Sequence, residues 1–586
     1  MAEERKPDEI LNAILAGSED KSIPELLKEM PNEKLIKSFY YMESIPEVTQ
    51  MRVLQDILKS AQNSEFGKKM GFAELKSVDD FRNKLPISDY SQVEAEIEKL
   101  KAGTGDILFD GATASFIATS GSTGIPKLIP ESKNGQLVKG LVSQIRATLL
   151  LMLAPEVMAA GKKVLAIANP SEYGRTAGGI AIGSASGQAA KDMPTEMLKK
   201  MVLPPAMMMA KEVSNEATDY LTIRYALAEK NLVGVVCSNI AHFNILLKKM
   251  NAQAAELLAD IRTGQISASI TIDPSLREKL VSELVADPER AAELETILEN
   301  KKTLDVAAIW PDFAVVSCWM SASAAKIVAD IKKQLPQTVK FLEWGYGASE
   351  GKFNIPDKAQ DPAGLPALFG YFFEFLPVGA THNQTVLVHE LEKGCYYELI
   401  ITSYSGLYRY NMKDIVYVTE INNQLPRLVF VCKESEKLQV QQLQLRVYEI
   451  DGAIQTISDR LNHEIRFYQV LLDQENNKLI FMLEPYSERF DSDSFRVSLD
   501  QHLAEINPSY QQLRVAQQLW PAELIVVRDG YRDSLFTRSI MPGKNVNQTK
   551  LKTIVSEYPD SSSVVDWAKE GEKDKDNSQI DLFPQY

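Results

Sequence analysis

Apolar residues recur at two different spacings along the first 380 residues. The first hundred residues are typical of helices, and in LPISDYSQVEAEIEKLKAG (85–103) apolar positions three and four apart lie between a Ser-Asp start and Gly103. Residues 135–153 predict a long buried helix. Since strands and helices alternate, the pattern predicts an α/β fold with largely parallel sheets. The predicted buried strands are short apolar runs bounded by turn-forming residues: KKVLAIANP (162–170), NLVGVVCSN (231–239), FAVVSCWM (313–320) and TVKFLEWGYG (338–347).

The pattern changes after about residue 380. The segments TVLVHELE, CYYELIITS and LPRLVFVC are typical of antiparallel strands with charged or Asn-rich turns between them. From about Lys433 a smaller α+β unit is predicted, with helices at YEIDGAIQTISDRL and FDSDSFRVSLDQHLAEI and a hairpin formed by IRFYQVLLD and KLIFMLEP. We therefore expect an N-terminal domain over 1–432 and a C-terminal domain over 433–586 that ends in a charged tail.

Composition narrows the classes of function. The chain has 586 residues, of which 45% are hydrophobic, enough for a large core, and its net charge of −15 argues against wholesale nucleic-acid binding. Its four cysteines lie far apart without CxxC spacing, which makes a disulfide scaffold or a zinc site improbable. The N-terminus does not resemble a secretory signal, and no window holds 18 uninterrupted apolar residues. We expect a soluble, cytoplasmic protein without a membrane partner.

A loop rich in small residues lies between two strand-like stretches in FIATSGSTGIPKLIPES (116–132). Glycines let a backbone approach phosphate oxygens closely, hydroxyl groups can donate to those oxygens, and Lys127 adds a positive charge. The segment is not a Walker loop, because GxxxxGK[ST] is absent. Taken alone, it is equally typical of a phosphate-binding loop and of a polar loop.

Two further segments carry candidate chemistry. WGYGASEGKF places Glu350 just beyond an apolar strand, and SGLYRYNMKDIVYV places Asp414 after Tyr408, Arg409 and Tyr410. In order and spacing, the three segments resemble the signature motifs of adenylate-forming enzymes. Those motifs are a Ser/Thr/Gly-rich phosphate loop, a YGxTE-like turn and a Y-R-x-GD-like turn.

The resemblance sharpens to the Gretchen Hagen auxin-responsive family of acyl acid amido synthetases. It is carried by TAGGIAIGSASG, by YELIITSYSGLYRYNMKDIVYV, by NVNQTK near the C-terminus, and by IWPDFAVVSCWMSASA, which resembles the bacterial branch in particular. It covers roughly residues 60–555. The resemblance implies an α/β fold: a large N-terminal adenylate-forming domain with mixed or parallel sheets, and a smaller, mobile α+β C-terminal domain.

The resemblance also implies a two-step reaction that uses ATP and Mg²⁺. A small carboxylic acid forms an acyl-adenylate, and an amine, usually an amino acid, then displaces AMP. Glu350 is implied to be a catalytic residue and the Mg²⁺ ligand, Asp414 to hold the ribose, and Lys550 to be the catalytic lysine. The implied nucleotide-contacting residues are Thr119, Ser120, Gly121, Ser122, Thr123, Lys127, Tyr346, Gly347, Ala348, Ser349, Arg409, Asp414 and Lys433.

Several positions leave alternatives open. Lys413 replaces the glycine expected before Asp414, and Lys544 and Lys552 compete with Lys550 for the role of functional lysine. Arg409 is as typical of a structural ion pair as of a nucleotide contact. Glu374 is better interpreted as a buried, paired acid, and His242 as a core histidine.

Two other functions compete with the amide synthetase. A thioester-forming acyl-CoA ligase would share the first half-reaction, and a noncatalytic relative would only bind nucleotide or a partner. The full set of loop hydroxyls, Glu350, Asp414 and Lys550 argues against the noncatalytic alternative. The sequence does not indicate which acid or which amine is used.

Overall fold

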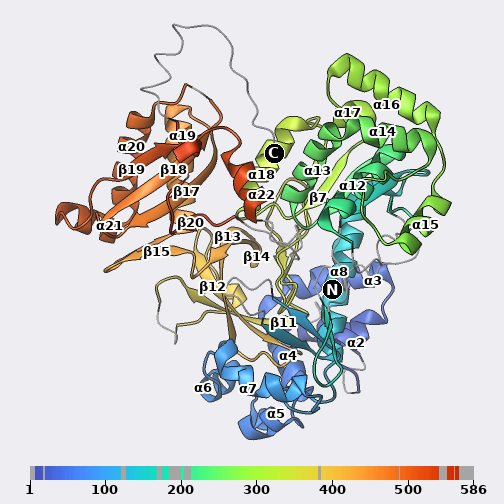
Figure 1. Cartoon of the computed structure of the whole chain (residues 1–586). Coiled ribbons are helices and arrows are strands. Elements are labelled where there is room, and N and C mark those ends of the chain that lie inside the picture. The colour runs from blue at the N-terminus through green and yellow to red at the C-terminus, as the bar shows by residue number, and fades with distance from the viewer. Residues whose placement is uncertain are drawn as a thin grey trace, which may run out of the picture. The chain divides into compact units, whose positions relative to one another are not determined.

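The structure is a computed structural model that describes residues 7–16, 20–119, 127–167, 174–183, 199–203, 213–380, 384–487, 489–539, 551–559 and 561–565. The chain forms two compact units, the first over Met1–Lys433 and the second beginning at Glu434 (Figure 1). Each unit has a hydrophobic core of its own.

The first unit opens with short helices, as the sequence predicts. Asp89 caps α7 by accepting a hydrogen bond from the Ser91 backbone N–H, and the chain leaves the helix near Gly103, whose φ is 93°. The predicted helix, with its Ser-Asp start and its stop at Gly103, is therefore confirmed as α7 (Tyr90–Lys101). The helices are α1 (Pro7–Ile14), α2 (Ile23–Lys28), α3 (Asn32–Ser44), α4 (Pro46–Lys59), α5 (Glu65–Met70), α6 (Val78–Lys84) and α7 (Tyr90–Lys101), with a 3₁₀ turn at Phe72–Glu74.

A parallel sheet forms the second core of this unit. Its strands are β3 (Lys163–Ile167), β6 (Leu232–Cys237), β7 (Val315–Cys318) and β8 (Lys340–Glu343), in the order β3-β6-β7-β8. All four predicted buried strands are thus confirmed, and their near-continuous apolar runs are those of strands covered on both faces. The accompanying helices are α12 (Asn215–Ala228), α13 (Ile240–Ala252), α14 (Ala254–Thr263), α15 (Pro274–Glu283), α16 (Pro288–Lys301), α17 (Val306–Ile309) and α18 (Ala324–Gln334).

The remaining sheets of the first unit are mixed or antiparallel. One has the order β2-β1-β5-β4, a second is the antiparallel pair β10-β9, and a third has the antiparallel order β11-β12-β13-β14. The predicted strand TVLVHELE is wrong: Val386 makes only a single bridge to Phe375, and Val388–Glu390 is a 3₁₀ turn held by the Glu390 carboxylate, which accepts from the Leu387 N–H. The strands are β1 (Ser115–Ala118), β2 (Leu128–Glu131), β4 (Gly174–Arg175), β5 (Ala181–Gly183), β9 (Asn354–Ile355), β10 (Leu365–Pro366), β11 (Tyr371–Pro377), β12 (Tyr396–Ser403), β13 (Tyr410–Asn422) and β14 (Leu425–Lys433).

The predicted long helix is α8 (Lys133–Leu153), which starts where the Ser132 hydroxyl accepts from the Gly135 N–H. Within the described part of the chain it is the one helix long and apolar enough to cross a membrane, judged by length and composition alone. Its buried side, which includes Val138, Leu141 and Ile145, belongs to the first hydrophobic core. The helix is followed by a short 3₁₀ turn at Pro155–Met158.

The second unit is an α+β module. The predicted hairpin is confirmed as the antiparallel pair β17 (Ile465–Asp473) and β18 (Lys478–Pro485), in a sheet of order β19-β18-β17-β20. The two predicted helices are confirmed as α19 and α20. The remaining elements are β15 (Lys437–Val440), β16 (Leu443–Arg446), α19 (Val447–Leu461), α20 (Ser492–Ile506), α21 (Pro508–Val515), β19 (Glu523–Val526), α22 (Tyr531–Ser539), β20 (Ile554–Val555) and a 3₁₀ turn at Ser561–Ser563.

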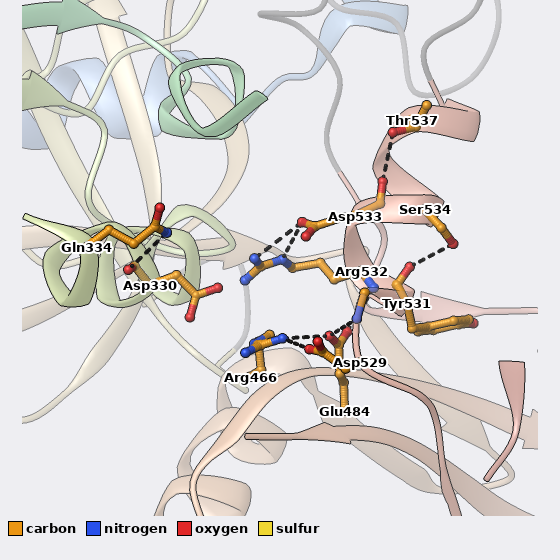
Figure 2. A network of polar contacts seen from close by, with 11 residues as sticks. Asp330, Gln334, Arg466, Glu484, Asp529, Tyr531, Arg532, Asp533, Ser534 and Thr537 are labelled. Atoms are coloured by element: carbon orange, nitrogen blue, oxygen red, sulfur yellow. Dashed lines mark hydrogen bonds and ion pairs between the residues drawn. The ribbon is translucent and has the colours of Figure 1, made fainter. Parts of the chain in front are cut away.

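A polar network fastens the start of α22 to this sheet (Figure 2). Glu484 of β18 is fully buried and accepts from the backbone N–H groups of Gly530 (2.9 Å) and Arg532 (2.8 Å). Arg466 of β17 pairs with Glu484 and with Asp529. The Glu484 carboxylate therefore satisfies helix-terminal donors that would otherwise be buried without partners.

Candidate active site

A tight turn follows β8 and presents the sequence WGYGASEG. Gly345 starts it at φ 91°, and a Cβ there would lie 2.5 Å from the Arg146 guanidinium, so the position requires glycine. Glu343 accepts from the N–H groups of Gly345 (2.8 Å) and Met320 (2.7 Å), and burial raises the pKa of Glu343 to about 7. These contacts fix the course of the backbone between the end of β8 and Tyr346.

One face of α8 holds this turn along its length. Lys139 donates to the Ser349 carbonyl (2.8 Å), and Ser143 bonds Lys352. Arg146 donates to the carbonyls of Tyr346 (3.0 Å) and Asn354 (2.9 Å). Positions 139, 143 and 146 follow the i, i+4, i+7 spacing of one helix face. This face is absent from the predictions made from the sequence, although three polar residues at that spacing in an apolar helix signal it.

Asp414 lies at the meeting point of three segments. It is opposite Lys433 in the β13–β14 register, and it is only 2% exposed. One carboxylate oxygen accepts from the Tyr346 hydroxyl (2.6 Å), and the other bonds the Lys433 ammonium group. The Tyr346 ring stacks on Phe430 with ring centroids 5.2 Å apart. The structure thus brings together three of the predicted site residues, Tyr346, Asp414 and Lys433.

Lys413, which replaces the expected glycine, adopts the left-handed conformation that glycine favours. Its φ is 54°, and its backbone N–H donates to the Asn411 side chain (2.8 Å). A side chain in this region costs about 1–2 kcal/mol. The departure from the motif therefore leaves the turn before Asp414 in the geometry that a glycine would adopt.

Glu350 is half-buried and lies close enough to Asp414 for the two charges to interact. Burial raises the pKa of Glu350, the negative charge of Asp414 raises it further, and Lys433 and Lys139 oppose both effects. Glu350 and Lys139 line a small cavity with Tyr371 and Ser405, with room for about one water molecule. Within the described ranges no group of three or more His, Cys, Asp or Glu side chains could hold a metal. A single carboxylate fits Mg²⁺ that takes its other ligands from phosphates and water.

The ends of the Ser/Thr/Gly loop come together at its root. The Thr119 N–H donates to the Lys127 carbonyl (2.9 Å), and the Lys127 N–H donates to the Thr119 hydroxyl (3.0 Å). The exposed Lys127 ammonium group lies 5.1 Å from the centroid of the Tyr90 ring. The Ser349 hydroxyl donates to the Ala118 carbonyl (3.2 Å), so the loop root adjoins the Glu350 turn.

The remaining predicted residues of this loop, Ser120, Gly121, Ser122 and Thr123, lie outside the described residues, and so do Lys544 and Lys550. Their predicted roles stay predictions. Lys552 is exposed, and its backbone carbonyl accepts from the Gln469 side chain (2.8 Å). That bond involves only its main chain, so it leaves the competition between the three lysines open.

The structure shows the ion-pair alternative for Arg409. Its guanidinium is buried and makes a bidentate pair with Glu374 (2.9 and 3.0 Å), while it also donates to the Leu85 carbonyl (2.7 Å). Arg82 donates to the same carboxylate (2.8 Å). Glu374 is therefore the buried, paired acid that the sequence predicted. His242 is likewise a buried core histidine, 2.6 Å from Asp219.

Comparisons with known proteins cover most of the chain. The GH3 family N-terminal domain matches residues 35–340, the GH3 family central domain matches 365–433, and the GH3 family C-terminal domain matches 448–559. An indole-3-acetic acid-amido synthetase of Arabidopsis thaliana, GH3.3, is 23% identical over 92% of this chain and 95% of its own length. A jasmonoyl–L-amino acid synthetase of Nicotiana attenuata, JAR6, is 25% identical over 75% of this chain and 78% of its own length.

Solved structures share the fold. The AtGH3.15 acyl acid amido synthetase in complex with 2,4-DB matches with a TM-score of 0.78 at 18% identity, over 93% of this chain and 97% of the other. A 2-hydroxyisobutyryl-CoA ligase in the postadenylation state matches with a TM-score of 0.50 at 10% identity, over 89% of this chain and 90% of the other. The predicted fold class, α/β with a large N-terminal part and a smaller C-terminal part, is confirmed.

Proposed function

The chain belongs to the GH3 family, and on that premise we propose that it is an ATP-dependent acyl acid amido synthetase. A carboxylate oxygen of a small acid attacks the α-phosphate of ATP and displaces pyrophosphate. An amine, in our proposal an amino acid, then attacks the acyl carbon and displaces AMP. The observation that supports this best is the pair of carboxylates, Asp414 and Glu350, set around Tyr346 in a chain that the three family domains match in order.

The chemistry of these groups suits the two ends of ATP. Each oxygen of the Asp414 carboxylate accepts one hydrogen bond from the protein and keeps a second lone pair, so the pair of oxygens can hold a ribose diol. Glu350 would hold Mg²⁺, which neutralises phosphate charge when bound. Lys433 and Lys139 reduce the repulsion between the two carboxylates, and they keep the local charge compatible with an anionic nucleotide.

The proposal is tested by a screen of small carboxylic acids for ATP-dependent release of pyrophosphate. The best acid is then combined with the common amino acids or with coenzyme A, and the products are identified by mass spectrometry. An amide product supports the proposal, and a thioester would favour the acyl-CoA ligase instead. ATP binding without pyrophosphate release for any acid would favour a noncatalytic relative.

Glu350→Gln is expected to raise the Mg²⁺ concentration needed for half-maximal pyrophosphate release by roughly tenfold, about 1.4 kcal/mol. An amide oxygen carries no formal charge and is a poorer ligand for a hard cation than a carboxylate. The measurement is a Mg²⁺ titration at saturating ATP. Glu420→Gln, which removes a half-exposed salt-bridge acid on β13, is the control. A Glu350→Gln titration that overlays the wild type would make Glu350 a structural acid.

Lys550→Ala is expected to slow acyl-adenylate formation at least about tenfold more than it slows conversion of supplied acyl-adenylate to amide. A lysine at the α-phosphate stabilises charge that builds up as the carboxylate attacks, whereas AMP leaves the second step as a stable anion. The two half-reactions are measured separately, with Lys544→Ala and Lys552→Ala in parallel. Equal losses in both half-reactions would count against Lys550, and a selective loss in Lys544→Ala would move the role to Lys544.

A further inference from the structure

We propose that Lys139 of α8 is a positioning residue that holds the β1–β2 hairpin, the root of the Ser/Thr/Gly loop, in register with the Glu350 turn. The inference rests on the proposed function, because it assigns Lys139 to the adenylation half-reaction.

The first contact joins Lys139 to the hairpin. Its ammonium group lies 2.6 Å from a carboxylate oxygen of Glu131, the last residue of β2, and the two side chains are 13% and 1% exposed. Burial would raise the pKa of Glu131, but the charge of Lys139 and hydrogen bonds from Lys139, Ser115 and Gln136 outweigh it and lower that pKa, so Glu131 is ionised. The other Glu131 oxygen accepts from the Ser115 hydroxyl (2.6 Å). Ser115 and Glu131 are partners in the β1–β2 register, so Lys139 is bonded to β2 directly and is linked to β1 through the Glu131–Ser115 hydrogen bond.

The second contact joins the same ammonium group to the turn. Lys139 donates to the carbonyl of Ser349 (2.8 Å), the residue before Glu350. Lys139 and Glu350 also line the same small cavity. The Ser349 hydroxyl reaches the hairpin directly through the Ala118 carbonyl (3.2 Å). The hairpin and the turn are therefore joined twice, once through Ser349 alone and once through the chain Glu131–Lys139–Ser349.

Stability gives little reason to place an ion pair at this position. Taking two charges out of water is costly, and uncharged replacements of similar volume often match or exceed the stability of a buried pair. An ion pair does, however, fix the distance and orientation of Lys139 relative to Glu131, which a methionine packed at the same position would not do. A shift of about 1 Å in a positioning element can reduce a rate by roughly 100-fold. The pair is therefore better explained by the geometry that it imposes on the loop root and on Glu350.

The test is the double variant Lys139→Met/Glu131→Gln. Lys139→Met alone would leave Glu131 as a buried charge without its cation and would destabilise the protein, whereas the double variant removes both charges and keeps an acceptor for Ser115. We expect its melting temperature to stay close to the wild type. We expect its kcat for acid-dependent exchange of labelled pyrophosphate into ATP to fall roughly 10- to 100-fold, with a smaller change in KM for ATP.

The matched control is Lys133→Met on the same helix, since Lys133 pairs with Glu25 at the surface and is 79% exposed. Its exchange rate should equal the wild type. A folded double variant with wild-type kcat would overturn the inference, and so would a loss of rate that equals its loss of folded protein. Failure of the wild-type protein to catalyse exchange with any acid would instead contradict the proposed function, and the inference with it.

Discussion

Asp414→Asn is expected to lower the rate of acid-dependent adenylation about 30- to 1,000-fold, because a charged, bidentate contact to the ribose contributes about 2–4 kcal/mol. The variant keeps the volume of the side chain and a partner for the Tyr346 hydroxyl, so the protein should remain folded. In the wild type the Asp414 carboxylate is held in place by Tyr346 and Lys433 before any ligand binds. A preorganised acceptor of this kind loses little entropy when the nucleotide arrives.

The measurement is ATP affinity by calorimetry together with the exchange rate. Asp260→Asn is the matched control, since Asp260 is also a buried carboxylate that accepts from a tyrosine hydroxyl, that of Tyr220 (2.8 Å). The control should bind ATP and catalyse exchange as the wild type does. Near-wild-type ATP binding by Asp414→Asn would refute the ribose assignment.

Arg409→Met is expected to lower the free energy of unfolding by about 3–5 kcal/mol, because it leaves the buried Glu374 carboxylate with Arg82 as its remaining cationic partner. It also removes the donors to the carbonyls of Arg82 and Leu85. Activity should fall only in proportion to the folded fraction. The Arg409 guanidinium already uses its donors on Glu374 and on the two backbone carbonyls.

Urea denaturation followed by circular dichroism measures this loss. The double variant Arg409→Met/Glu374→Gln should recover part of the stability, because no carboxylate that has lost a cationic partner stays buried. If Arg409→Met instead unfolds at the wild-type urea concentration and fails to bind ATP, Arg409 contacts the nucleotide and the structural assignment is wrong.

Much of the fold could be predicted from local pattern. The strands at 163–167 and 340–343 are short apolar runs between turn-forming residues. Such runs are typical of parallel strands that are covered on both faces, so they could be recognised without knowledge of their partners. TVLVHELE has the same alternation as a strand, but only Val386 bridges to a strand, through Phe375 of β11. Strand pairing is a tertiary property, and a single segment does not encode its partner.

The candidate site likewise has residues that the sequence identifies and contacts that only the tertiary structure creates. Glu350 and Asp414 could be identified because family motifs fix them at short range in the sequence. The arrangement around them could not, because Lys433 meets Asp414 only through the β13–β14 register, and Lys139 meets the turn across 210 residues. The domain bounds 1–432 and 433–586, the cytoplasmic location and the bacterial branch stay predictions from the sequence.

In the proposed reaction, this chain activates a carboxylic acid as its adenylate and transfers the acyl group to an amine. The most direct test of this reaction is exchange of labelled pyrophosphate into ATP with the purified protein, followed by addition of amino acids and identification of the product. We expect exchange that requires a carboxylic acid, is lost in Asp414→Asn, and leads to an amide. ATP binding without exchange for any acid, or a thioester formed with coenzyme A in place of an amide, would contradict the proposed reaction.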